Sequence, residues 1–173
     1  MIQRIRLLVL LARPAVLTLF GLFAATGLAQ AGNGNDAWLL AKALTVVISF
    51  VLFAVAVNDI ADVRIDRVNL PHAANRPLAV GTARSTEMVV VAIVGAVFAL
   101  GASTLLYWPA PVVVAGGLLL AGAYSLRPIQ ISHRGVLAPM LLPAGYVAVP
   151  YLVGIFAARG TVTRVDLLLL AGL

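Results

Sequence analysis

The sequence predicts an all-α membrane protein, a bundle of transmembrane helices, and three observations lead to that prediction. Hydrophobic residues make up 62% of the 173-residue chain and charged residues only 10%, which is too little polar surface to cover a water-soluble globule. The apolar residues gather in runs of about 20, the length that crosses a bilayer as a helix. Most of the arginines fall in the segments before or between these runs.

Five apolar runs are long enough to be complete spans. In chain order they cover residues 14–31, 38–57, 86–107, 109–126 and 136–158. A sixth run begins near Val165, and the sequence ends inside it at Leu173. A run of about nine residues cannot cross a membrane. We therefore expect residues 1–173 to form one membrane domain that is the N-terminal part of a longer domain.

The first run has an alternative interpretation as a cleavable signal peptide. Arg4, Arg6 and Arg13 accompany an apolar stretch that ends in the small-residue sequence Ala29-Gln30-Ala31. The stretch is long for the apolar region of a signal peptide, which favours a retained span.

Two residue types predict how the spans are shaped and packed. The fifth span contains Pro139, Pro143 and Pro150, which predict kinks; an alternative is that these prolines make room for a long lipid chain. Close helix packing is expected at three glycines: Gly116, Gly117 and Gly122.

The distribution of positive charge predicts the orientation of the spans. With the N-terminus inside, nine arginines fall in cytoplasmic segments, whereas Lys42, Arg159 and Arg164 fall on the other side. We therefore expect the N-terminus and the end of the second span to face the cytoplasm, in a bacterial-type plasma membrane.

The remaining composition excludes several classes of function. The net charge of +6 does not indicate nucleic-acid binding, because the aromatic-interleaved basic patch of such proteins is missing. The chain has no cysteine, which excludes disulfides, thiolate zinc sites and cysteine nucleophiles.

Half of the acidic residues lie together at the end of the second apolar run. Of six acidic residues, Asp59, Asp62 and Asp66 fall within eight positions, in the stretch VAVNDIADVRIDRVNLPHAANRPLAVG at residues 55–81. A helix turns about 100° per residue, so these three carboxylates and the Asn58 amide face the same way.

Local electrostatics do not favour this cluster. Asp62 and Asp66 are a like-charged pair at helical spacing. If the helix ends near Asn69, Asp66 also lies near the negative end of the helix dipole. Arg64 and Arg67 fall on the far side of the helix, where they cannot neutralise the carboxylates.

Two interpretations of the cluster remain open from the residues alone. It is either a solvated helix end or a site where a bound cation offsets the repulsion. Oxygen ligands suit a hard ion, and Mg²⁺ uses one or two carboxylates together with water and phosphate oxygens. Arg76 follows in a loop marked by Pro71, Pro77 and Gly81, and it either binds phosphate or serves only the positive-inside pattern.

Two stretches resemble a known family. NDIADVRID at residues 58–66 has the pattern N-D-x-x-D-x-x-x-D, and with NRPLA at 75–79 it resembles the first aspartate-rich motif of the UbiA superfamily of intramembrane prenyltransferases. AYSLRPIQISHRGVLAP at 123–139 resembles the tyrosine-serine and proline-containing loop after the fourth span of that family. The likeness extends from LARPAV at 11–16 onward.

The resemblance implies a fold, a reaction and a set of partners. The fold would be an all-helical bundle of about nine spans around a cavity that opens sideways to the lipid bilayer. The reaction would be Mg²⁺-dependent transfer of an isoprenyl group from an isoprenyl diphosphate to a small, aromatic acceptor, in quinone, pigment or related lipid biosynthesis. Hydroxybenzoate, naphthoate, homogentisate and a chlorin are among the acceptors left open, as are the prenyl length and the oligomeric state.

The resemblance also implies roles for individual residues. Asp59, Asp62 and Asp66 would be catalytic and would bind the metal. Arg13 would contact the acceptor. The residues implied in diphosphate binding are Asn58, Arg76, Tyr124, Ser125, Arg127 and Arg134.

The sequence departs from the family pattern in one respect. The second aspartate motif of the family follows the sixth span, and the only acidic residue of this chain after Glu87 is Asp166. The 173-residue chain is therefore expected to be inactive alone. Alternatives to an enzyme are a non-catalytic membrane fragment or partner subunit, and a cation-coupled transporter with acids deep inside broken helices.

Overall fold

The computed structural model describes residues 13–172, and every regular element in this range is helical. The prediction of an all-α fold is confirmed for these residues. The basic lead with Arg4 and Arg6, and with it the signal-peptide alternative, lies outside the described residues. The helices are α2 (Pro14–Gln30), α3 (Ala37–Asn69), α4 (Ser85–Ser103), α5 (Pro109–Ser125), α6 (Leu137–Pro143), α7 (Val149–Ala158) and α8 (Arg164–Ala171), with a 3₁₀-helix η1 (Ile131–His133) and a π-helix η2 (Ala144–Ala148).

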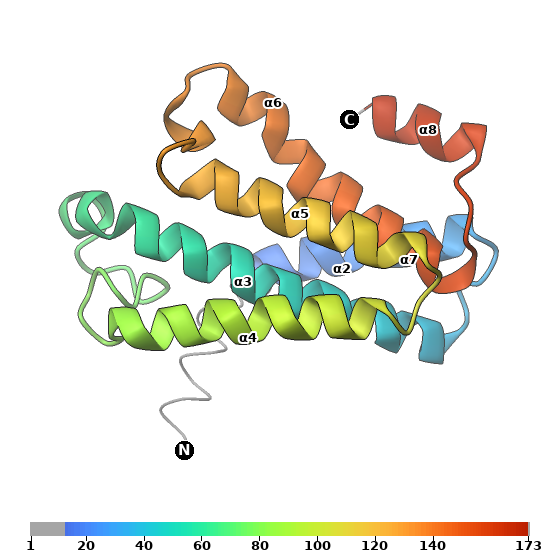
Figure 1. Cartoon of the computed structure of the whole chain (residues 1–173), viewed down its shortest axis with the longest axis horizontal. Coiled ribbons are helices and arrows are strands. Elements are labelled where there is room, and N and C mark those ends of the chain that lie inside the picture. The colour runs from blue at the N-terminus through green and yellow to red at the C-terminus, as the bar shows by residue number, and fades with distance from the viewer. Residues whose placement is uncertain (1–12, 173) are drawn as a thin grey trace.

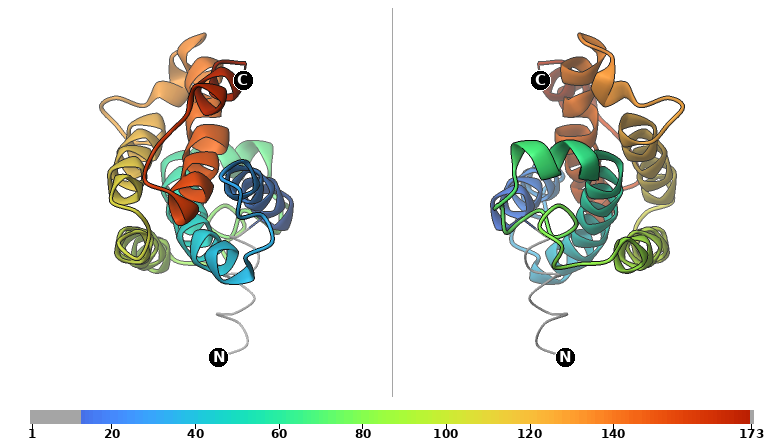
Figure 2. Two further views of the ribbon diagram at one scale, coloured as in Figure 1. Left: turned by 90° about the vertical axis from the view of Figure 1, so that its right-hand side faces the viewer. Right: turned by 90° about the vertical axis from the view of Figure 1, so that its left-hand side faces the viewer.

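The long helix α3 organises the bundle (Figure 1). It lies between α2 and α4 when the bundle is viewed end-on (Figure 2), and it also contacts α5 and α7. The largest hydrophobic cluster is centred on α3, where Val46, Val47, Phe50 and Val51 are almost completely buried. The far end of α3 carries the aspartates, so the same helix holds the core and the polar cluster.

Three stretches are long and apolar enough to cross a membrane: Ala37–Asn69, Ser85–Ser103 and Leu137–Ala158. Pro14–Gln30 and Pro109–Ser125 are shorter apolar helices. The five predicted runs thus correspond to five apolar helical stretches. That all five cross the membrane, and that the full bundle has nine spans, remain predictions.

Helix α3 begins and ends where its sequence indicates. The Asp36 carboxylate accepts hydrogen bonds from the backbone N–H groups of Trp38 and Leu39, at 2.9 and 3.0 Å, which caps the first turn. The helix ends at Asn69, as expected. Its 33 residues are about 50 Å long, against about 30 Å of hydrocarbon in a bilayer, so its last turns can extend beyond the apolar layer.

The predicted fifth span is an interrupted helix. Helix α6 ends at Pro143, the π-helix η2 follows, and α7 begins with Pro150 in its first turn. A proline cannot donate a backbone hydrogen bond and crowds the preceding turn, which explains an irregularity here. The irregular shape that the prolines predict is therefore present.

Helices α2 and α7 pack backbone to backbone. A side-chain carbon added at Gly154 would collide with the carbonyl oxygen of Ala24, and one added at Gly27 would collide with that of Tyr151. Because each collision is with main chain, neither can be relieved by a side-chain rotation. Glycine at both positions allows the two helices to approach this closely.

The glycines selected from the sequence behave differently from one another. Gly117 packs against the Phe50 ring and the Val149 side chain, as predicted. Gly116 and Gly122 have no neighbouring atom within 4 Å of an added side-chain carbon. Close packing was therefore the wrong interpretation for Gly116 and Gly122.

The late acidic residue Asp166 joins α7 to α8 at the end of the molecule opposite the aspartate cluster. Its carboxylate is fully buried and accepts hydrogen bonds from Arg159 Nη2 at 2.5 Å, Tyr151 OH at 3.1 Å and the backbone N–H of Thr163 at 2.6 Å. These partners fully engage the carboxylate, which accounts for an acid in this apolar surrounding.

A pair of Gly→Ala substitutions tests the contact between α2 and α7. Alanine is the better helix former, so Gly116→Ala on the open face of α5 should stabilise the protein by about 0.5 kcal/mol or more. Gly154→Ala should instead lower the free energy of unfolding by about 2 kcal/mol, because its methyl group meets main chain. Unfolding in detergent measures both. A Gly154→Ala protein as stable as the Gly116→Ala protein would contradict the close contact.

Candidate functional site

The acidic cluster lies at the end of α3, and its side chains face the interior of the molecule. Asp59 is 1% exposed and Asp66 is 7% exposed. Asp62 borders a cavity, and its Oδ2 accepts a hydrogen bond from the Asn58 amide at 2.8 Å. The carboxylates are therefore not a solvated helix end, which was one of the two interpretations left open by the sequence.

One guanidinium joins most of the cluster. Arg76 Nη1 lies 2.7 Å from Asp59 Oδ1, 3.0 Å from Asp66 Oδ2 and 3.2 Å from Asn58 Oδ1. The arginine side chain is only 17% exposed. In a poorly hydrated setting these charge-assisted contacts are stronger than their equivalents on an open surface.

The loop after α3 holds Arg76 in place. Pro77 and Leu78 are buried against the bundle directly after it. The carbonyl oxygen of Arg76 accepts hydrogen bonds from the N–H groups of Ala79 and Val80, at 3.0 and 3.1 Å. A buried anchor and a hydrogen-bonded turn thus direct the guanidinium at the carboxylates.

A second arginine binds the same carboxylate from another helix. Arg13 Nη2 lies 2.6 Å from Asp59 Oδ1, although the two residues are 46 positions apart. Arg13 directly precedes α2 and has a φ of +44°, a left-handed conformation that costs a non-glycine residue about 1 to 2 kcal/mol. Its contact with Asp59 helps to hold this conformation, and such strain is typical of functional sites. Two arginines thus balance Asp59 and Asp66.

A cavity of about 370 Å³ opens beside this cluster and extends between α2, α3, α5 and α6. Its inner part is apolar and includes Phe20, Phe50 and Leu142. Its polar end is lined by Arg13, Asn58, Asp62, Arg76, Ser125 and Ser132. One end of the cavity therefore suits charged groups and the rest suits hydrocarbon.

The structure brings some of the remaining predicted residues to this cavity and leaves two outside it. Tyr124 and Ser125 line it, at the end of α5. Arg127 is exposed and is not among the lining residues. Arg134 is also exposed; its guanidinium donates hydrogen bonds to the carbonyl oxygens of Ile129 and Pro128, at 2.5 and 3.3 Å, within its own loop. A phosphate role for these two arginines remains a prediction.

Two residues near the site were not singled out from the sequence. The Ser132 hydroxyl is buried at the cavity wall, and His133 Nε2 lies 3.9 Å from Asp62 Oδ1. Both belong to η1, in the stretch AYSLRPIQISHRGVLAP that already resembled a family motif. That stretch was the available signal, but only the fold shows which of its side chains approach α3.

Unpartnered polar atoms concentrate at this site. In residues 13–172, four buried side-chain polar atoms lack a hydrogen-bond partner, and three of them are Asp59 Oδ2, Arg13 Nε and Ser132 Oγ. Buried polar groups are nearly always paired, so such atoms need an explanation. Arg13 and Ser132 line the polar end of the cavity, and Asp59 is the carboxylate that Arg13 contacts. Open donors and an open acceptor at this end indicate a site for a polar ligand.

The described residues contain no ready-made metal cage. Within 13–172, no group of three or more histidine, cysteine, aspartate or glutamate side chains is arranged to hold a metal ion. Arg13 and Arg76 occupy one oxygen of Asp59, and Arg76 also contacts Asp66. Any cation at this site would need oxygens from water or from a bound substrate in addition to the carboxylates.

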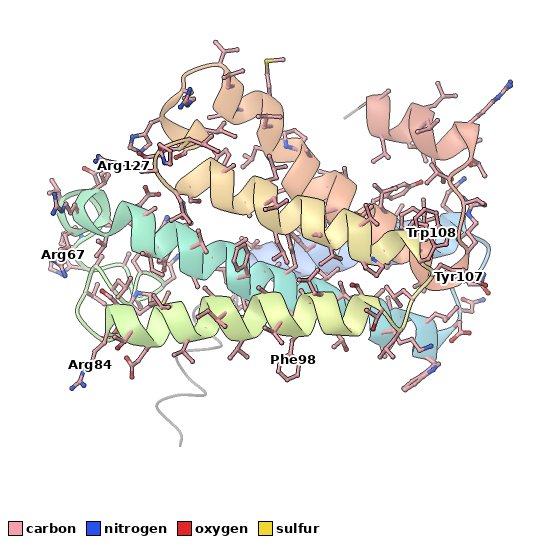
Figure 3. All side chains as sticks on the ribbon, in the orientation of Figure 1. Arg67, Arg84, Phe98, Tyr107, Trp108 and Arg127 are labelled. Atoms are coloured by element: carbon pink, nitrogen blue, oxygen red, sulfur yellow. The ribbon has the colours of Figure 1, made fainter. Side chains whose placement is uncertain are left out.

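Several arginines and two exposed aromatic residues lie at opposite ends of the bundle. Figure 3 shows Arg67, Arg84 and Arg127 at the end where the acidic cluster lies, and Tyr107 and Trp108 at the other. Trp108 is 77% exposed, as expected of a residue at a membrane interface. This arrangement agrees with the charge pattern of the sequence. That the end with these arginines faces the cytoplasm remains a prediction.

The chain was compared with protein families, with curated proteins and with solved structures. The model of the UbiA prenyltransferase family matches residues 17–173 of the chain. No curated protein matches the chain. A solved structure, that of a UbiA homolog from Archaeoglobus fulgidus bound to DMAPP and Mg²⁺, superposes with a TM-score of 0.75 and 16% sequence identity. The match covers 91% of this chain and 56% of that one.

These findings show a fold and a family. At 16% identity the structural likeness supports the fold alone, and the chain spans little more than half of the length of that protein. The family match extends over nearly the whole chain, including the aspartate motif, Arg76 and the loop after α5. With its apolar helices, the protein is an integral membrane protein, and the chain belongs to the UbiA prenyltransferase family.

Proposed function

We propose that this chain binds an isoprenyl diphosphate together with Mg²⁺ at the polar end of its cavity, and contributes this part of the site to prenyl transfer onto a small, aromatic acceptor. The observation that carries the proposal is the junction of a charged cluster with an apolar cavity. Asp62, Arg76 and Ser132 stand at one end of a space whose other walls are hydrocarbon. A diphosphate with an isoprenyl tail has this same division of polar and apolar parts.

The residues fit Mg²⁺ in the way this ion usually binds substrates. Mg²⁺ takes one or two carboxylates and completes its coordination with water and phosphate oxygens. Asp62 borders the cavity, and Asp59 Oδ2 has no hydrogen-bond partner. We propose these two carboxylates as the nearest ligands, with Asp66 joining when Arg76 turns to the diphosphate.

The diphosphate would meet donors from three elements. Arg76 from the loop after α3 and Ser132 from η1 line the polar end, with Tyr124 and Ser125 on α5. Arg13 lies beside them, so a diphosphate contact is open to it as well as the acceptor contact that the resemblance implies. A guanidinium can bind two phosphate oxygens at once, which suits a ligand with several such oxygens.

The reaction places opposite charges on the two fragments of the donor. When the carbon–oxygen bond breaks, negative charge develops on the diphosphate, where Arg76 and Arg13 can stabilise it. Mg²⁺, when bound, supplies Lewis-acid stabilisation of the same oxygens. Positive charge develops on the allylic carbons, and the ring of Tyr124 lines the cavity where it can face this charge. The apolar walls exclude water, which would otherwise intercept the cation.

The location of two other aromatic residues narrows the choice for that role. The Tyr151 hydroxyl donates a hydrogen bond to the Asp166 carboxylate at the opposite end of the bundle, and Trp108 is exposed. Neither residue lines the cavity, so neither is placed to stabilise the allylic cation.

The ligands of the structural neighbour support the proposal of an isoprenyl diphosphate with Mg²⁺. The Archaeoglobus fulgidus protein was solved with DMAPP and Mg²⁺ bound, and its fold covers most of this chain. We further propose that the site and the N-terminus face the cytoplasm of a bacterial-type plasma membrane, as the arginine distribution predicts. Because the second aspartate motif does not occur in these residues, we propose that turnover needs residues beyond them.

The transporter alternative has less support. It predicts acidic residues deep within broken helices. The interrupted helix is present, but its π-helical segment AGYVA carries no acid, and the aspartates cluster at a helix end. The break and the charges therefore lie in different places.

An Asp→Asn exchange tests the metal role. Asp62→Asn should abolish Mg²⁺-dependent binding of radiolabelled geranyl diphosphate, because an amide is a poor Mg²⁺ ligand. Asp36→Asn is the matched control, since asparagine caps a helix about as well as aspartate. Full Mg²⁺-dependent binding in Asp62→Asn would refute the metal role.

An Arg→Lys exchange tests the guanidinium. Arg76→Lys keeps the charge but loses the geometry that reaches Asp59, Asp66 and a phosphate together. We expect geranyl diphosphate to bind about tenfold more weakly, a loss of about 1.4 kcal/mol. Arg67→Lys, on the exposed side of α3, should bind as the unmodified protein does. Equal affinities for the two variants would argue against Arg76 as a phosphate ligand.

Ser132→Ala separates ligand binding from stability. The buried hydroxyl lacks a partner, so its removal should leave the protein equally stable or up to about 1 kcal/mol more stable. If the hydroxyl binds the diphosphate, the same change should weaken binding about fivefold. Thermal unfolding and a binding isotherm measure the two effects. Unchanged affinity would remove Ser132 from the site.

A further inference from the structure

Three aromatic rings line the inner, apolar part of the cavity. Phe20 of α2, Phe50 of α3 and Tyr146 of η2 all line it. We infer that this aromatic floor, which consists of these three residues, limits the donor to short isoprenyl chains of geranyl size or smaller. The inference rests on the proposed function, because it concerns the tail of the diphosphate substrate.

The lining residues of α3 give the depth of the cavity. Asp62, Asn58, Ala54 and Phe50 follow one another at intervals of one helical turn, and all four line the space. Phe50 lies eight residues before Asn58, which is about 12 Å along the helix axis. A tail that starts beside Asn58 and follows α3 therefore meets the Phe50 ring after a length that suits a geranyl group.

The three rings brace one another. The Phe20 and Tyr146 ring centroids are 5.0 Å apart in an edge-to-face arrangement, and those of Phe20 and Phe50 are 6.2 Å apart. Both distances lie in the range of favourable aromatic pairs. The floor therefore joins three elements that are far apart in the sequence.

The floor is also supported from behind. Phe20 and Phe50 are each only 2% exposed. The Phe50 ring rests against Gly117 of α5, where a side-chain carbon would lie 3.0 Å from it. A ring packed in this way cannot swing aside without opening the core, and dense cores yield little to an inserted group.

The π-helix places the third ring. Tyr146 is the central residue of η2, where the wider turn changes the direction of the side chains relative to a continuous α-helix. Gly145, beside it, also lines the cavity and adds no side chain to the space. The π-helix in the fifth apolar run thus supplies Tyr146, one of the three rings of the aromatic floor. The sequence offered a different possibility, in which the prolines of this run make room for a long lipid chain.

The test widens and narrows the cavity in turn. Phe50→Leu and Phe20→Leu shorten the floor side chains, whereas Ala54→Phe adds a ring one turn closer to the diphosphate. Phe98→Leu is the matched control, because Phe98 on α4 is 61% exposed and points away from the bundle (Figure 3). Each full-length protein is reconstituted in nanodiscs. Calorimetry with Mg²⁺ then measures binding of dimethylallyl, geranyl, farnesyl and geranylgeranyl diphosphate.

Each result bears on the inference in a stated way. The unmodified protein and Phe98→Leu should bind geranyl diphosphate about tenfold more tightly than the farnesyl and geranylgeranyl forms, a margin typical of size selection in apolar pockets. At least one of Phe50→Leu and Phe20→Leu should lose this preference for geranyl diphosphate. Ala54→Phe should bind only dimethylallyl diphosphate. Thermal unfolding identifies any variant that is not folded, and the inference then stands or falls on the others.

Two further outcomes are distinct. If all four diphosphates bind the unmodified protein equally, the tail leaves the cavity sideways into lipid and the inference is overturned, although the proposed function stands. If none of them binds in the presence of Mg²⁺, the proposed function fails and this inference fails with it.

Discussion

The contact between the Arg76 guanidinium and the carboxylates of Asp59 and Asp66 is the constraint on which the polar end of this molecule depends. A buried carboxylate is costly unless it is paired, and removal of one partner from a buried ion pair typically costs about 3 to 5 kcal/mol. The chain supplies this pairing itself, with Arg13 as the second cation on Asp59. From the residues alone, the cluster was either a solvated helix end or a site where a bound cation offsets the repulsion. The fold shows that Asp59 and Asp66 are already paired with arginines. Under the proposed function, a cation would compete with the arginines for these carboxylates, and a diphosphate would compete with the carboxylates for the arginines.

Under the proposed function, competition of this kind would couple the binding of Mg²⁺ and the diphosphate. A cation that takes an oxygen of Asp59 weakens the hold of that carboxylate on Arg13 and Arg76, and the released guanidinium groups then favour an anion. The reverse follows by the same equilibrium. The unpartnered atoms at the site include an acceptor on Asp59 and donors on Arg13 and Ser132, which is the pattern expected if cation and polyanion arrive together. This balance also explains why a strongly acidic cluster persists beside apolar walls.

Features that depend on local periodicity could be predicted from the sequence, whereas long-range contacts could not. The apolar runs, the end of α3 at Asn69 and the shared direction of the aspartates follow from the turn of a helix. The pairing of Arg13 with Asp59 joins residues 46 positions apart, and the approach of His133 to Asp62 depends on how the loop after α5 folds back. The glycines show the same limit. The sequence led us to Gly116 and Gly122, which face open space. Only the crossing of α2 and α7 in the fold reveals that Gly27 and Gly154 are tightly packed.

The π-helix has a consequence for the register of the fifth apolar stretch. A π turn holds one residue more than an α turn, so deletion of a single residue within Ala144–Ala148 would restore a continuous α-helix. Everything on the N-terminal side would then rotate by about 100° relative to α7. Leu141 and Leu142 would leave the cavity wall, while the contact of Gly154 with α2 would be unaffected. Insertion or loss of one alanine is thus a step by which relatives of this chain could reshape the cavity without disturbing the rest of the bundle.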